Sequence, residues 1–117
     1  MKKTILTAMS AFLISSAVPA AAELVFPLLS YRTGAYAPNG IPIADGFSDY
    51  LTLINERDGG IGGEKIKMIE CETAYNTEKG VECYESTKGQ GSLVYWPLST
   101  GITSVSYTHL RAHETRI

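Results

Sequence analysis

Short apolar runs alternate along this chain with longer amphipathic segments. Residues 24–29, 65–72 and 93–96 are apolar or alternate between apolar and polar, which predicts strands. Residues 43–54 and 76–88 place apolar side chains on one helical face, which predicts helices. A strand–helix–strand–helix–strand order is typical of a parallel sheet with right-handed crossovers. The sequence therefore predicts an α/β fold built on a parallel sheet.

The predicted boundaries rest on particular residues. Pro27 suits a strand near its end or at an edge of the sheet. Pro42 is tolerated in a first helical turn, and Gly59 can end that helix in the left-handed conformation. Asn76 or Thr77 can cap the second helix. The apolar stripes predicted to face inward are Ile43, Phe47, Tyr50, Leu51 and Ile54 on the first helix, and Val81 and Tyr84 on the second.

The glycine-rich run Gly59–Gly63 does not indicate a dinucleotide site. Such a site needs a glycine turn between a strand and the start of a helix. Here the glycines follow a helix and precede a strand. A helix stop with a tight turn explains them.

The first residues have the pattern of a secretory leader. Lys2 and Lys3 precede an uncharged, mostly apolar run over residues 5–18, and small residues follow Pro19 up to Ala22. A transmembrane anchor is the alternative, but the run is shorter than the ~20 residues that a spanning helix needs. We expect residues 1–22 to be a signal peptide, cleaved near Ala22, and the product to be exported.

The composition and the motifs argue against several classes of function. A net charge of −2 and a pI near 5.6 do not favour binding to nucleic acid. The sequence has no Gly-x-Ser-x-Gly or His-Glu-x-x-His motif, so no catalytic residue is assigned. His109, His113 and Glu114 could be interpreted as metal ligands on one helical face, but a metal site is not expected. No cofactor is predicted.

Cys71 and Cys83 are the only cysteines. An even count in an exported chain favours a disulfide between them, and two free thiols are the alternative. Closing a loop of this size constrains the unfolded chain by roughly 3 kcal/mol.

Ligands of open parallel sheets bind at the carboxyl ends of the strands. Ser30–Gly40 and Pro97–Thr103 are predicted to be the loops at that edge. In the second loop, the hydroxyl groups and amides of Ser99 and Thr100 can hold a ligand carboxylate without an arginine.

Several of these motifs together resemble a known family. They are the leader, Pro27–Ser30, Thr33–Gly34, Asn39–Gly40, Ala44–Gly46, Ile54–Asn55, Gly59–Gly63 and Lys65–Ile66. This set resembles the opening of the periplasmic substrate-binding proteins of branched-chain (leucine/isoleucine/valine-type) amino acid ABC transporters. The resemblance covers residues 24–103 and implies a partial N-terminal lobe, over residues 23–103, of a protein whose two α/β lobes close over a solute. Residues 104–117 depart from the pattern and are interpreted as a non-native tail.

The resemblance also implies a function and a site. The protein would capture a small solute in the periplasm and deliver it to an ABC permease in the inner membrane, with no enzymatic activity. Ser30, Tyr36 and Asn39 would line the cleft, while Ser99 and Thr100 would hold the carboxylate of the solute. Leucine-binding members carry an aromatic residue about where Asn39 lies, so aromatic acids, amides and urea are further candidates. A receptor sensor domain with the same fold and a small secreted α/β enzyme are the alternatives.

Overall fold

The computed structural model of the protein describes residues 22–114. The predicted signal peptide, apart from Ala22, lies outside these residues. No helix in the described part is long and apolar enough to cross a membrane.

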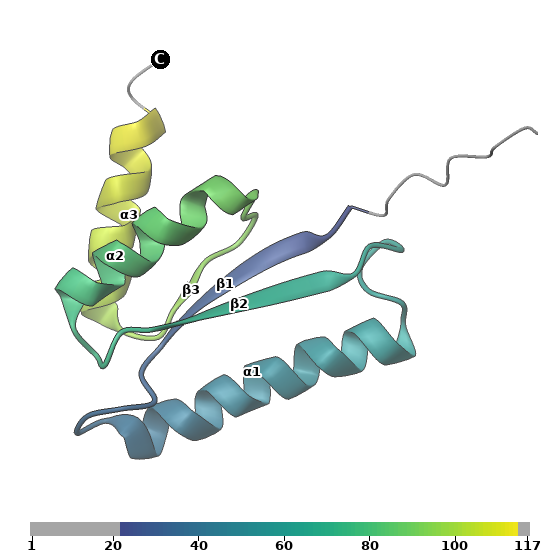
Figure 1. The fold of residues 1–117 in the computed structure, drawn as a ribbon, viewed down its shortest axis with the longest axis horizontal. Helices are drawn as coiled ribbons and strands as arrows, with labels where there is room; N and C mark the ends of the chain where they lie inside the picture. The colour runs from purple at the N-terminus through teal and green to yellow at the C-terminus, as the bar shows by residue number, and fades with distance from the viewer. Residues whose placement is uncertain (1–21, 115–117) are drawn as a thin grey trace, which may run out of the picture.

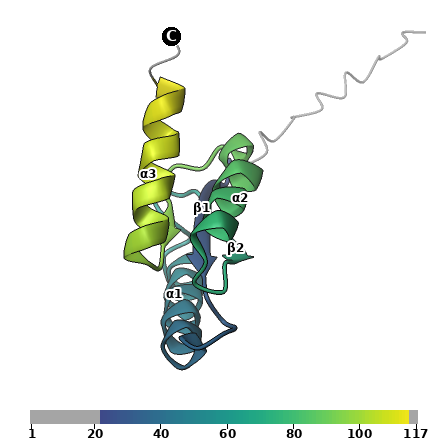
Figure 2. The same cartoon turned by 90° about the vertical axis from the view of Figure 1, so that its left-hand side faces the viewer.

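The structure is a three-stranded parallel sheet, as predicted, and helices lie on both of its faces (Figure 1). The order of the strands is β2-β1-β3, so the first strand is the central one. Helix α1 covers one face, and α2 and α3 lie side by side on the other (Figures 1 and 2). The elements are β1 (Leu24–Ser30), α1 (Ala37–Arg57), β2 (Ile66–Glu72), α2 (Thr77–Thr87), a short 3₁₀ helix η1 (Lys88–Gln90), β3 (Trp96–Pro97) and α3 (Thr100–Glu114).

Each face of the sheet has its own apolar cluster. Phe26, Leu51 and Ile66 are buried between the sheet and α1. Leu29, Cys83 and Ile102 are buried between the sheet and the pair α2 and α3. Because side chains alternate along a strand, β1 supplies both clusters and is buried along most of its length.

Pro27 does not mark an edge strand, and this corrects the prediction. The carbonyl groups of Val25 and Leu29 accept hydrogen bonds from Leu93 and Leu98, so alternate residues of β1 turn their backbone polar groups toward β3. Pro27 lies between these two residues and has no N–H to donate there. A central strand therefore accommodates it on the side where pairing with β3 is incomplete.

The third strand is shorter than predicted and begins later in the sequence. Only Trp96 and Pro97 form β3, opposite Leu28 and Leu29, while Ser92 makes an isolated bridge to Val25. The predicted strand residues Leu93 and Val94 are exposed instead. The missing N–H of Pro27 faces this gap.

Helix α1 begins earlier than predicted. It starts at Ala37 with Pro38 in its first turn, and Pro42 lies inside the helix rather than at its start. The buried positions are Gly40, Ala44 and Leu51, with Phe47 and Ile54 partly buried, whereas the predicted inward residues Ile43 and Tyr50 are exposed. The sheet therefore contacts a face rotated from the predicted stripe.

The predicted loop Pro97–Thr103 is shorter than expected, because β3 ends at Pro97 and α3 begins at Thr100. The start of α2 and the turn after α1 agree with the prediction. Asn76 caps α2 and its side chain accepts a hydrogen bond from the Lys79 backbone. Tyr84 is buried and Val81 is partly buried. The run Gly59–Gly63 ends α1 and turns into β2, with positive φ at Gly59, Gly60, Gly62 and Gly63.

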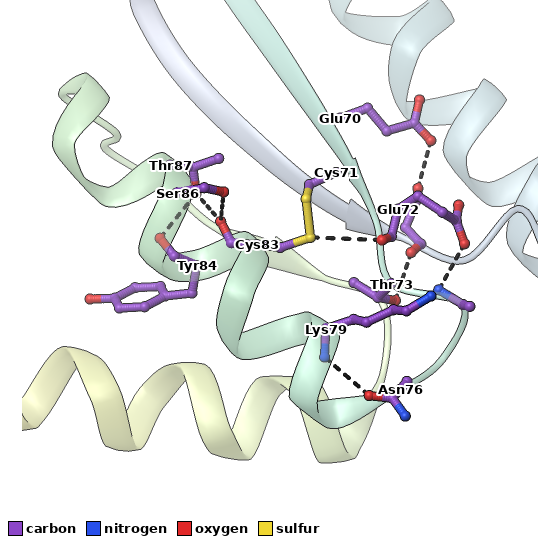
Figure 3. The surroundings of a disulfide bond; sticks show 12 residues. Glu70, Cys71, Glu72, Thr73, Asn76, Lys79, Cys83, Tyr84, Ser86 and Thr87 are labelled. Atoms are coloured by element: carbon purple, nitrogen blue, oxygen red, sulfur yellow. Dashed lines mark hydrogen bonds between the residues drawn. A yellow bond between two sulfur atoms is a disulfide. The ribbon is translucent and has the colours of Figure 1, made fainter.

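A disulfide joins Cys71 on β2 to Cys83 on α2, with their Cα atoms 5.8 Å apart (Figure 3). Cys83 is buried and packs with Leu29 and Ile102. The bond fixes α2 against the end of β2, next to the loop that connects them.

Candidate functional site

The carboxyl ends of all three strands meet at one edge of the sheet (Figure 1). Ser30 pairs with Glu72 in the ladder between β1 and β2, so the loops that follow them, residues 31–36 and 73–76, start side by side. The connection from β3 to α3 leaves the same edge. Three loops therefore surround the position where parallel sheets bind ligands.

A cavity of about 710 Å³ opens at this edge. It is lined by Tyr75, Pro97, Ser99, Thr100, Thr103, Ser104 and Tyr107. Among the residues that the structure describes, no charged side chain lines it. The cavity therefore offers hydroxyl groups, backbone amides and tyrosine rings to a ligand.

Ser99 and Thr100 lie where α3 begins. The Ser99 hydroxyl accepts a hydrogen bond from the Ile102 backbone at 3.2 Å, and the Ser99 carbonyl accepts one from the Thr103 backbone at 2.8 Å. The N–H groups of Thr100 and Gly101 have no acceptor within the described part of the chain. Unpaired N–H groups at a helix start favour an anion, which suits a carboxylate.

Three tyrosines form an aromatic cluster beside these donors. The Tyr36 and Tyr75 rings lie 4.3 Å apart at 34°, and the Tyr31 ring meets Tyr75 edge-on at 4.9 Å. Tyr31 is buried, whereas Tyr36 and Tyr75 are 52% and 40% exposed. We call Tyr36 and Tyr75 the tyrosine wall: both rings are partly exposed, Tyr75 lines the cavity, and Tyr36 packs against Tyr75.

Three residues expected in the cleft, Ser30, Tyr36 and Asn39, do not line the cavity, although the Tyr36 ring contacts Tyr75, which does. Ser30 is fully buried, and its hydroxyl donates a hydrogen bond to Glu70 Oε1 at 2.6 Å. Its carbonyl accepts two hydrogen bonds from Thr73, so Ser30 ties β1 to the end of β2. Asn39 lies exposed in the first turn of α1, where its N–H donates to the Tyr36 carbonyl.

Arg32, in the loop after β1, forms ion pairs with acidic residues of β2 and α1. Arg32 pairs with Glu70 through Nε and with Asp45 at 2.7 Å, and both hydrogen bonds raise its pKa. Burial raises the pKa of Glu70, but hydrogen bonds from Arg32 and Ser30 outweigh that effect and hold the pKa below its usual range. Arg32 is thus engaged by two carboxylates and does not line the cavity.

Sequence reasoning missed Tyr75. The two loops predicted at the carboxyl edge follow the first and the third strand, and neither contains Tyr75. β2 ends at Glu72, so Tyr75 belongs to the same edge. An aromatic residue three positions after a predicted strand was the available signal.

The predicted tail begins inside a helix. Helix α3 continues without a break through residue 104 to Glu114, and Ser106 is buried within it. A foreign origin for residues 104–117 stays a prediction. In the described part of the chain, no group of three histidine, cysteine or acidic residues could hold a metal ion.

Comparison with known proteins identifies the family of this chain. Residues 23–114 match the family described as periplasmic binding protein. The crystal structure of a protein from the Pseudomonas fluorescens group, described as an ABC transporter permease, aligns with a TM-score of 0.58 and 47% identity. The alignment covers 62% of this chain and 18% of that one, so this chain spans a small part of that protein. No curated protein matches. The chain belongs to the periplasmic binding protein family.

Proposed function

We propose that this chain is part of the solute-binding component of an ABC importer. The whole protein would capture a branched-chain amino acid or a related small solute (aromatic acid, amide or urea) in the periplasm and deliver it to a permease in the inner membrane. The observation that carries the proposal is the cavity at the carboxyl edge, where Ser99 and Thr100 lie beside Tyr75 in a periplasmic binding protein fold.

The chemistry of the cavity favours a solute with a carboxylate and an apolar part. The free N–H groups of Thr100 and Gly101, with the Thr100 hydroxyl, supply donors for the carboxylate. The tyrosine wall supplies ring surface for the apolar part. The solute would be held by neutral donors, as the resemblance implies.

One lobe alone should bind weakly. A hydrogen bond that competes with water contributes about 1 kcal/mol, and three such contacts give about 3 kcal/mol. An affinity near 1 mM corresponds to about 4 kcal/mol, so binding to this chain should be millimolar or weaker. Calorimetric titration with leucine, valine, phenylalanine, benzoate and urea should therefore give no saturable heat in the micromolar range.

Amide NMR of the isotope-labelled 117-residue chain detects weaker binding. We expect millimolar benzoate or phenylalanine to shift the amide signals of Thr100, Gly101 and Tyr75. Benzamide, which keeps the ring but lacks the carboxylate, should shift Tyr75 more than Thr100. Thr100→Val should reduce the shifts, because it removes a donor and keeps the shape of the side chain.

Thr52→Val is the matched control, since Thr52 is an exposed residue of α1 away from the cavity. It should leave the shifts unchanged. Shifts confined to other parts of the chain, or equal losses in both variants, would show that the carboxyl edge is not the solute site. Saturable micromolar heat would refute the view that one lobe forms only part of the cleft.

A further inference from the structure

We propose that Glu72 is a positioning residue whose carboxylate ties the loop after β1 to the loop after β2 and thereby fixes the tyrosine wall. The role of that wall in binding rests on the proposed function. The contact between the two rings does not, so the two claims can be tested separately.

The Glu72 carboxylate contacts both loops. Its Oε2 accepts a hydrogen bond from the Arg32 backbone at 2.7 Å. Its Oε1 accepts one from the Ala74 backbone at 2.7 Å and one from the Thr33 hydroxyl at 3.1 Å. Figure 3 shows Glu72 at the end of β2, with its side chain bonded to the loop that follows. One side chain thus holds two segments that lie forty positions apart in the sequence.

These loops carry the two members of the tyrosine wall. Tyr75 follows Ala74 directly, and Tyr36 ends the short loop that contains Arg32 and Thr33. Their rings lie 4.3 Å apart, so a small displacement of either loop would separate them. Fixing the loops therefore fixes the wall.

The loop after β2 needs such support. Ala74 and Tyr75 adopt φ values of 49° and 61°, which residues with a Cβ rarely adopt. Three bonds hold this conformation: Ala74 N–H to Glu72 at 2.7 Å, Asn76 N–H to the Thr73 carbonyl at 2.9 Å, and Tyr75 N–H to the Thr73 hydroxyl at 3.3 Å. The Glu72 bond is the shortest of the three.

The charge of Glu72 matters because all three of its partners are donors. A neutral carboxyl or amide would turn an N–H or O–H toward one of them and would lose at least one bond. Burial raises the pKa of Glu72, but hydrogen bonds from the backbones of Arg32 and Ala74, then from Thr33, outweigh it and lower the pKa overall.

Charged groups surround this carboxylate on three elements. Glu70 lies on the same strand and pairs with Arg32, which also pairs with Asp45 of α1. Lys79 and Glu82 of α2 line one depression together with Glu72. The Arg32 guanidinium donates its hydrogen bonds to Glu70 and Asp45. The Glu72 carboxylate is therefore held by neutral donors, which are two backbone N–H groups and the Thr33 hydroxyl.

The test compares Glu72→Gln with Glu56→Gln in the full 117-residue chain. Glu56 is an exposed acid on α1 away from this edge and serves as the matched control. We expect Glu72→Gln to keep the far-UV circular dichroism but to lose the Tyr36–Tyr75 ring contacts in NOE spectra and part of the near-UV tyrosine signal. Glu56→Gln should keep both.

Acidification supplies an independent measurement. In the unmodified chain the ring contacts should be lost as the pH falls through the Glu72 pKa, while the far-UV signal persists. If Glu72→Gln fails to fold, this titration decides alone. Ring contacts that survive both the substitution and the acid titration would overturn the proposal.

A benzoate titration separates the two claims. In Glu72→Gln, the shift at Thr100 should remain and the shift at Tyr75 should be lost. If benzoate shifts neither residue even in the unmodified chain, the proposed function fails, whereas loss of the ring contacts in Glu72→Gln would still support the positioning role.

Discussion

Two glycines in helices allow a matched test of how α2 and α3 pack. A Cβ added at Gly80 would lie 2.8 Å from Cγ2 and 3.0 Å from Cγ1 of Ile102, which is fully buried. A Cβ added at Gly46 in α1 would meet nothing within 4 Å. Both substitutions to alanine add one methyl group inside a helix, and the main difference between them is the contact that the new methyl group makes.

The expected magnitudes follow from that contrast. Alanine is favoured over glycine inside a helix by about 1 kcal/mol, so Gly46→Ala should raise the free energy of unfolding by about that amount. Gly80→Ala gains the same helix propensity, but its new methyl group crowds the buried side chain of Ile102, which costs about 1–3 kcal/mol. We therefore expect Gly80→Ala to lower the free energy of unfolding by about 1 kcal/mol, a difference of about 2 kcal/mol between the variants.

Urea unfolding followed by far-UV circular dichroism measures both values. Ile102→Ala should itself cost about 2–5 kcal/mol, because it removes buried atoms from the cluster with Leu29 and Cys83. In the double variant the new methyl group at position 80 occupies part of that space, so the total loss should be smaller than the sum of the single losses. Additive losses, or equal stabilisation by Gly80→Ala and Gly46→Ala, would refute the packing that the structure describes.

Two further predictions concern the disulfide and the acidic residues of β2. Replacing both Cys71 and Cys83 by serine should lower the free energy of unfolding by roughly 3 kcal/mol, measured by urea unfolding of the oxidised parent and the variant; an unchanged midpoint would contradict this. The pKa values of Glu70 and Glu72 are lowered on folding, so their contribution is present above the unfolded value of about 4.3 and is lost as the pH falls through the folded values. Unfolding midpoints measured from neutral to acidic pH should fall steeply in that range, and less steeply in Glu70→Gln. A slope that does not change in this variant would show that Glu70 is not held by its ion pair.

The order of elements and the parallel sheet were predictable because they depend on local periodicity. Runs such as residues 24–29 and 65–72 indicate strands whatever their partners are. The rotation of α1 was not predictable in this way. Ile43 and Tyr50 fit an apolar stripe as well as Gly40 and Ala44 do, and only contact with the sheet selects the second set. At Gly40 a Cβ would lie 1.9 Å from the Tyr31 carbonyl oxygen, so glycine there permits the approach that defines the buried face.

Only those parts of the candidate site that lie within one segment of the sequence were predictable. Ser99 and Thr100 follow a strand and begin a helix, so their donors could be anticipated from neighbouring residues. The tyrosine wall and the Glu72 bridge depend instead on register, because the pairing of Ser30 with Glu72 brings together loops about forty positions apart. Alternation of apolar residues predicts that two strands exist, but it does not say which residue of one lies opposite which residue of the other. The position of Tyr75 after a strand can be found in the sequence, but its contact with Tyr36 and the bonds of Glu72 to the loop after β1 follow only from the register.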